Sequence, residues 1–127
     1  MVRRNTRAHR KVHHVTHISR LRLTTPSKIA AHIAESAPKE KTVIIDAFAG
    51  VGGNAIALAR TGRWERVFAI EKDPKTMECA KRNAEIYGVS GKIFWLTKDC
   101  FEAMGRFAGN KNVVIFASPP WGGKCSF

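Results

Sequence analysis

No apolar run in the sequence approaches the roughly 20 residues that a membrane-spanning helix needs. The basic N-terminus also lacks the apolar core of a secretory signal. The three cysteines, Cys79, Cys100 and Cys125, form no CxxC pair, so their spacing gives no zinc pattern and fits reduced, structural thiols. These absences favour an intracellular protein without a metal site.

Acidic residues are missing from the start of the chain. The first is Glu35, whereas residues 1–28 contain eight Lys and Arg side chains. This segment accounts for most of the net charge of +12, because the rest of the chain carries 14 basic and 10 acidic side chains. A run of like charges stays solvated unless a polyanion neutralises it. We therefore expect residues 1–22 to form a flexible basic arm that binds RNA or directs nuclear import, with a solubilising leader as the alternative. Residues 23–127 are enough for one modest domain.

Beyond the arm, patterns typical of helices and strands alternate. Thr25 and Pro26 predict the cap and first turn of a helix that ends at Pro38. Apolar runs at 42–46, 67–70, 92–96 and 112–117 predict four buried strands, and helical patterns at 54–61, 73–88 and 101–107 separate them. Continuous apolar strands in such an alternation predict an α/β fold, a parallel sheet with helices on both faces.

Acidic side chains follow three of the four predicted strands. Asp46 ends the first strand and precedes a glycine-rich turn, Glu71 ends the second, and Asp99 follows the third. Ligands of open parallel sheets bind outside the carboxyl ends of the strands, so we expect these acids to share one site. Each acid taken alone could instead be a cap, a turn former or a solvated surface side chain.

The residues at this edge indicate the type of ligand. Asn54 follows the glycines where a phosphate-binding turn of the Walker type has Lys. A carboxylate at Asp46 would repel a pyrophosphate and attract an ammonium group. An acid after the second strand suits ribose hydroxyls, and Asp99 can accept from an adenine amino group. Because glycine lets the backbone approach a ligand closely, the pattern predicts S-adenosylmethionine, which has all three groups.

The fourth predicted strand leads into Ser118-Pro119-Pro120-Trp121. Two prolines fix an extended turn, which aims the Ser118 hydroxyl or neighbouring carbonyls at a target nitrogen. Such acceptors bind the hydrogens of an exocyclic amine. Trp121 offers a flat face for a purine, and a cationic purine would gain a further cation–π contact. The alternative is that Trp121 is a core aromatic.

Together these motifs resemble the trimethylguanosine synthase family of RNA cap guanine methyltransferases. The resemblance covers about residues 24–123. The matching stretches are Thr25-Pro26, Asp46-Ala47-Phe48-Ala49-Gly50-Val51-Gly52-Gly53-Asn54, Asn83-Ala84-Glu85-Ile86-Tyr87-Gly88 and Ser118-Pro119-Pro120-Trp121-Gly122-Gly123.

The resemblance implies a Rossmann-like class I methyltransferase that uses S-adenosylmethionine and methylates the 2-amino group of the 7-methylguanosine cap of small nuclear and nucleolar RNA. It therefore implies a location in the nucleus or nucleolus, and also the cytoplasm. Catalytic roles are implied for Ser118, Pro119 and Trp121, and contacts with the substrate for Trp121, Asn83 and Thr25. Cofactor contacts are expected from Asp46, Ala47, Phe48, Gly50, Gly52, Glu71, Asp99 and Ser118.

The sequence also departs from the family pattern. Glu71 stands where the family usually has Asp, and the segment before Thr25 lacks an expected acid. The family's sheet should continue past Gly123, so we expect a C-terminally truncated domain of about four strands, with an exposed edge and an uncovered apolar face. Two alternatives stay open: a non-catalytic RNA-binding remnant, and a methyltransferase that acts on another RNA or DNA base amine.

Overall fold

The computed structural model describes residues 23–118, without the side chains of Thr24 and Thr25. The predicted arm, residues 1–22, lies outside this range, as do Pro119 and Trp121 of the predicted catalytic loop. The main elements in chain order are α2 (Thr24–Ser36), β1 (Val43–Asp46), α3 (Gly53–Arg60), β2 (Arg66–Ile70), α4 (Pro74–Ile86), β3 (Ile93–Leu96), α5 (Cys100–Met104) and β4 (Val113–Phe116), with short 3-10 helices η1 (Ser90–Lys92) and η2 (Gly105–Phe107).

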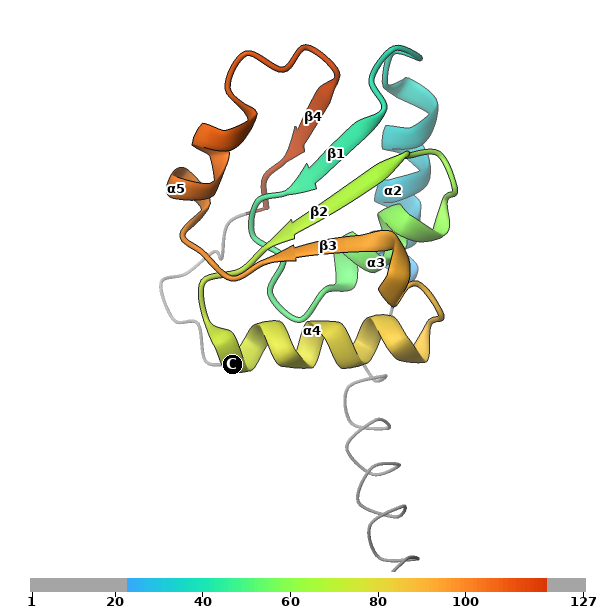
Figure 1. The fold of residues 1–127 in the computed structure, drawn as a ribbon. Coiled ribbons are helices and arrows are strands. Elements are labelled where there is room, and N and C mark those ends of the chain that lie inside the picture. Colours follow the sequence, from blue (N-terminus) through green and yellow to red (C-terminus); the bar gives the residue numbers. More distant parts are fainter. Residues whose placement is uncertain (1–22, 119–127) are drawn as a thin grey trace, which may run out of the picture.

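The four strands form one parallel sheet in the order β3-β2-β1-β4 (Figure 1). Strand β1 is central, and its register places Asp46 beside Ala69 of β2 and Phe116 of β4. All four strands therefore end at the same edge of the sheet. The predicted parallel α/β sheet is confirmed.

Helices lie on both faces of the sheet, as predicted. Alternate β1 side chains point to opposite faces, so Ile44 packs with α2 and α3, and Ile45 packs with α5. Helix α4 joins the α3 side of the core through its buried residue Ala84. Figure 1 shows α5 on the side of the sheet away from α2 and α3.

The α5 side is less well covered than the α3 side. Phe68 stacks on Phe94, with ring centroids 5.1 Å apart, and meets Phe107 edge-to-face, with centroids 4.9 Å apart. The side chains of Phe94 and Ile115 on the same face stay 50% and 52% exposed among the described residues. This agrees with the expected uncovered apolar face.

Two helix starts show where local sequence signals hold and where they fail. Asp73 and Pro74 are a local start signal for α4, and Asp73 does cap the helix, because its carboxylate accepts from the Thr76 backbone N–H at 2.9 Å. The predicted Thr25 cap is wrong, since α2 begins at Thr24 and its N-cap residue is Leu23, without a side-chain cap bond. Leu23 is 8% exposed and packs into the core, which fixes the start of α2 through burial instead of capping.

The glycine turn, residues 47–53, depends on close contact with α4. Gly52 has a φ of +94°, and a Cβ there would lie 3.2 Å from the Ala80 Cβ. Gly62 also has a positive φ, +67°, but a Cβ there would meet no atom within 4 Å. Substitutions at the two glycines can therefore be compared, because both would strain the backbone but only the one at Gly52 would also disturb packing.

We predict that Gly52→Ala lowers the free energy of unfolding by roughly 2–4 kcal/mol, since it combines left-handed strain with a steric clash. Gly62→Ala should lower it by only about 1–2 kcal/mol, because it introduces the strain alone. Urea unfolding of both variants measures the difference. Equal losses would contradict the proposed tight contact between Gly52 and α4.

Candidate active site

The carboxyl edge of the sheet brings together most of the predicted site residues that the structure describes. Asp46 ends β1, Glu71 follows β2, and Asp99 lies three residues after β3. The Glu71 N–H donates to the Leu96 carbonyl of β3 at 3.1 Å, which ties the end of β2 to β3. Ser118 is exposed and follows the end of β4 by two residues. The predicted convergence at one edge is therefore present.

The glycine turn is anchored to both neighbours of β1. The Ala47 N–H donates to Phe116 at the end of β4 at 2.9 Å, and the Ala49 N–H donates to Ile70 at the end of β2 at 2.8 Å. Phe48 packs against the α5 side of the core. At Gly50 the φ is +54°, and a Cβ would meet no atom within 4 Å. The turn thus holds bare backbone at Gly50 next to open space.

Asp46 is the most unusual residue of the site. Its side chain is 0% exposed; Oδ1 accepts from the Phe48 N–H at 3.3 Å, and Oδ2 is buried without a partner. Burial raises the pKa of Asp46 to about 7; the nearby backbone N–H groups of Phe48 and Ala55 act to lower it, and the charge of Glu71 acts to raise it. The sequence suggested a carboxylate that faces the ligand, whereas the structure buries it at the base of the glycine turn.

The other two acids have local backbone partners. Glu71 is half-buried, and its Oε2 accepts from the Asp73 N–H at 3.2 Å. Asp99 is exposed and is the N-cap residue of α5, with Oδ1 accepting from the Phe101 N–H at 3.0 Å. The turn-forming role that the sequence left open for Asp99 is therefore present. The predicted contact with adenine would use its remaining oxygen.

Asn83 occupies a different position from the one expected of a residue that contacts substrate. Its side chain is 3% exposed, and Nδ2 donates to the Val51 carbonyl of the glycine turn at 2.9 Å. It lies on the buried face of α4, one turn after Ala80. No local sequence pattern indicates this contact between α4 and the turn, because it joins residues 32 positions apart.

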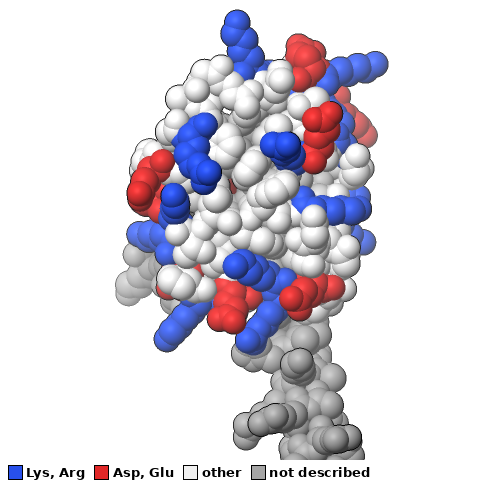
Figure 2. All heavy atoms as spheres, in the orientation of Figure 1, with Lys and Arg blue, Asp and Glu red and all other residues white. Residues whose placement is uncertain are grey.

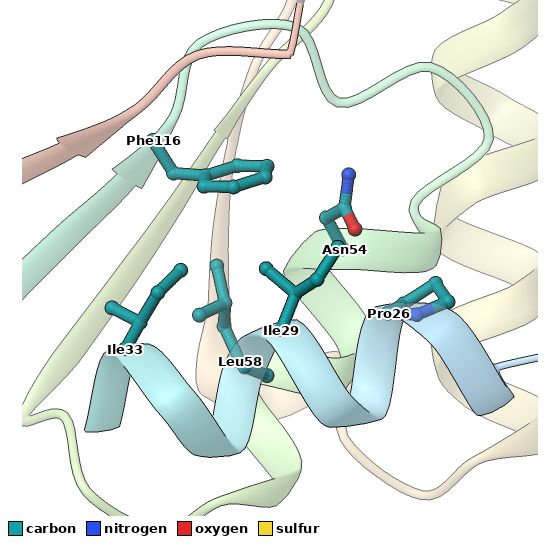
Figure 3. Close-up of a pocket in the computed structure, with 7 residues that line it drawn as sticks. Pro26, Ile29, Ile33, Asn54, Leu58 and Phe116 are labelled. Atoms are coloured by element: carbon teal, nitrogen blue, oxygen red, sulfur yellow. The ribbon is translucent and has the colours of Figure 1, made fainter. Parts of the chain in front are cut away.

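The start of α2 lies beside the glycine turn. A Cβ at Gly53 would lie 3.9 Å from the Pro26 ring, so the segment with Thr25 is brought to the site. Figure 3 shows a small hollow where α2, α3 and the end of β4 meet; Asn54 is the one polar side chain among the residues that line it. No carboxylate is among the residues that line this hollow.

The described surface is of mixed charge. Figure 2 shows Lys and Arg interspersed with Asp and Glu over the visible face. Within residues 23–118, no group of three or more His, Cys, Asp or Glu side chains could hold a metal ion. No helix in this range is long and apolar enough to cross a membrane.

The buried carboxyl of Asp46 predicts how stability depends on pH. A folded-state pKa of about 7, raised from 3.8, means that the folded protein binds a proton that the unfolded chain has released. The resulting stabilisation is fully present below about pH 4 and is lost as the pH rises to about 7. Across this range we expect the wild type to lose up to about 4 kcal/mol relative to Asp46→Asn, which keeps the shape of the side chain but does not titrate.

Urea unfolding of wild type and Asp46→Asn at several pH values between about 4 and 8 tests this. Because all other titrating groups are shared, the difference between the two proteins isolates Asp46. Parallel profiles would show that the buried carboxyl has an ordinary pKa.

Comparisons with known proteins identify related chains. The chain is 39% identical over 104 residues to the trimethylguanosine synthase of Schizosaccharomyces pombe, and 30% identical over 105 residues to that of Saccharomyces cerevisiae. Each match covers 78% of this chain but only 42% and 32% of the respective relative, so the chain spans less than half of their length.

A similar solved structure is that of an RNA methyltransferase from Salinibacter ruber in complex with S-adenosyl-L-homocysteine. The TM-score is 0.57 at 27% identity, and the match covers 76% of this chain and 60% of that one. The likeness supports the predicted Rossmann-like fold of S-adenosylmethionine-dependent methyltransferases. Residues 41–125, which include the glycine turn and Asn83, match the family model described as RNA cap guanine-N2 methyltransferase. The chain belongs to the RNA cap guanine-N2 methyltransferase family.

Proposed function

We propose that this chain carries the cofactor-binding part of an S-adenosylmethionine-dependent methyltransferase that acts on the 2-amino group of a 7-methylguanosine RNA cap. Membership of the family supports the reaction class. The observation that carries the proposal is the buried Asp46 carboxyl, whose Oδ2 has no partner at the base of the glycine turn. A buried acceptor without a donor is costly to the fold and is explained when a ligand supplies the donor.

The residues at the carboxyl edge fit S-adenosylmethionine. An ammonium group would supply the missing donor to Asp46, and the space beside Gly50 admits a ligand against bare backbone. Glu71 is close enough to Asp46 to raise its pKa and is placed after β2, where an acid binds ribose hydroxyls. Asp99 keeps one oxygen for an adenine amino group. When bound, the cofactor supplies an electrophilic methyl group on a sulfonium.

The proposed role of the loop after β4 is to orient the RNA amine. Ser118 is exposed at the carboxyl edge, and the motif continues with Pro119, Pro120 and Trp121. Acceptors in this loop would bind the amine hydrogens and leave the nitrogen lone pair directed at the methyl carbon. The cofactor would supply the methyl carbon for the new bond to nitrogen, with the electron pair of its carbon–sulfur bond left on sulfur, and the amine would lose a proton.

The proposed substrates are capped small nuclear and nucleolar RNAs, which places the protein in the nucleus or nucleolus. The support is the similarity to the two trimethylguanosine synthases, together with the match of residues 41–125 to the cap guanine family.

Removal of the Asp46 charge tests the cofactor assignment. We expect Asp46→Asn to weaken binding of S-adenosylhomocysteine about 10- to 100-fold, because a charge-assisted hydrogen bond to the ammonium is lost. Wild-type affinity should also rise between about pH 6 and pH 8 as the carboxyl ionises, and the variant should lack this rise. Calorimetry measures both effects, with Glu102→Gln as an exposed control. Unchanged affinity in Asp46→Asn would remove Asp46 from the cofactor site.

The preference for a methylated cap depends on Trp121. A 7-methylguanosine ring is cationic, so a tryptophan face should prefer it to guanosine by roughly 1–2 kcal/mol. Trp121→Ala should abolish this preference and leave cofactor affinity intact, and Trp121→Phe should keep part of it. Fluorescence titration of the 127-residue chain with a cap analogue and with guanosine measures the preference. Equal binding of both ligands before and after mutation would leave only a methyltransferase of another base amine.

A further inference from the structure

Helix α4 contacts the glycine turn at two successive positions on one face. Gly52 lies against Ala80, so closely that a Cβ would be 3.2 Å from the Ala80 Cβ. Three residues further along α4, Asn83 donates its Nδ2 hydrogen to the Val51 carbonyl at 2.9 Å. Residues three apart share a helix face, so these two contacts form one continuous support under the turn.

The second contact is polar although its surroundings are buried. Asn83 is 3% exposed, and its Oδ1 has no hydrogen-bond partner. The orientation of the amide is fixed by chemistry, because the Val51 carbonyl can only accept and therefore requires the NH₂ group. An apolar side chain would remove the unpaired Oδ1, but it would leave the Val51 carbonyl without its donor. The donor itself is therefore what the position uses.

The contact fixes the part of the turn that is nearest the proposed cofactor. Val51 lies between Gly50, which has open space above it, and Gly52, which is pressed against α4. The backbone before Val51 is held by the ends of β2 and β4, and the backbone after it enters α3 at Gly53. Asn83 thus restrains a turn whose own residues include glycines with a wide choice of conformation.

We propose that Asn83 is a positioning residue, which binds the Val51 carbonyl and so holds the Gly50–Gly53 backbone in the shape that accepts the cofactor, and that it does not contact the RNA base. The inference rests on the proposed function, since it concerns the same cofactor site. It changes the substrate-binding role expected from the sequence into a role on the cofactor side.

The first test needs no ligand. Asn83→Asp keeps the shape of the side chain but sets a carboxylate oxygen against the Val51 carbonyl, and Asn83→Ala removes the group. In the full 127-residue chain we expect hydrogen exchange at the Gly52 amide, which donates to the Ala49 carbonyl at 2.8 Å, to quicken about tenfold in both variants. The β1 and β2 amides should keep their protection. Glu85→Leu, at an exposed position on α4, is the control and should change neither. Unchanged exchange in the turn would overturn the proposal.

The second test separates positioning from simple loss of fold. Calorimetry with S-adenosylhomocysteine should show about tenfold weaker affinity for Asn83→Asp at an unchanged number of sites per chain. A purely structural role would reduce the number of competent sites at unchanged affinity, and a contact with the base would leave both values unchanged; either result overturns the proposal. If the wild type itself does not bind this ligand, the proposed function fails, and the exchange result still decides whether Asn83 holds the turn.

Discussion

The carboxyl group at the end of the central strand is the feature on which the rest of the site depends. Asp46 is enclosed by β2, β4 and the glycine turn, and one of its oxygens has no donor. Burial raises the pKa of this carboxyl. It therefore lowers the free energy of unfolding at neutral pH relative to acidic pH. A cationic group next to Asp46 would offset both effects.

The glycine turn is shaped by supports on three sides. Backbone hydrogen bonds from Ala47 and Ala49 fasten its start to β4 and β2. Contacts with α4 fasten its end through Gly52 and Val51. A turn of this composition would be mobile by itself, because glycine gives little conformational restraint. Its preorganisation is therefore a property of the surrounding helices and strands, and it reduces the ordering that a ligand would otherwise have to impose.

The two faces of the sheet differ in how well they are packed. The α3 side has nearly continuous burial across β1, β2 and the helix itself, whereas Phe94 and Ile115 remain half exposed on the α5 side. Helices α3 and α4, which meet the end of the glycine turn, both lie on the well-packed side. This arrangement lets the described part of the chain hold the glycine turn in place although its other face is open.

Much of the fold and the location of the site could be predicted from local sequence signals. Apolar runs marked the strands, Asp73-Pro74 marked the start of α4, and an acid after each of three strands marked the ligand edge. That edge follows from topology alone, because parallel strands place all their carboxyl ends together.

Other features depended on contacts between distant residues, which no local pattern contains. The start of α2 is set by burial of Leu23, the pKa of Asp46 by the elements that enclose it, and the role of Asn83 by a carbonyl 32 positions earlier in the chain. The sequence by itself determined which chemical groups gather at the carboxyl edge; only the tertiary structure decided which of them are buried and which hold others in place, since burial depends on packing across the whole domain.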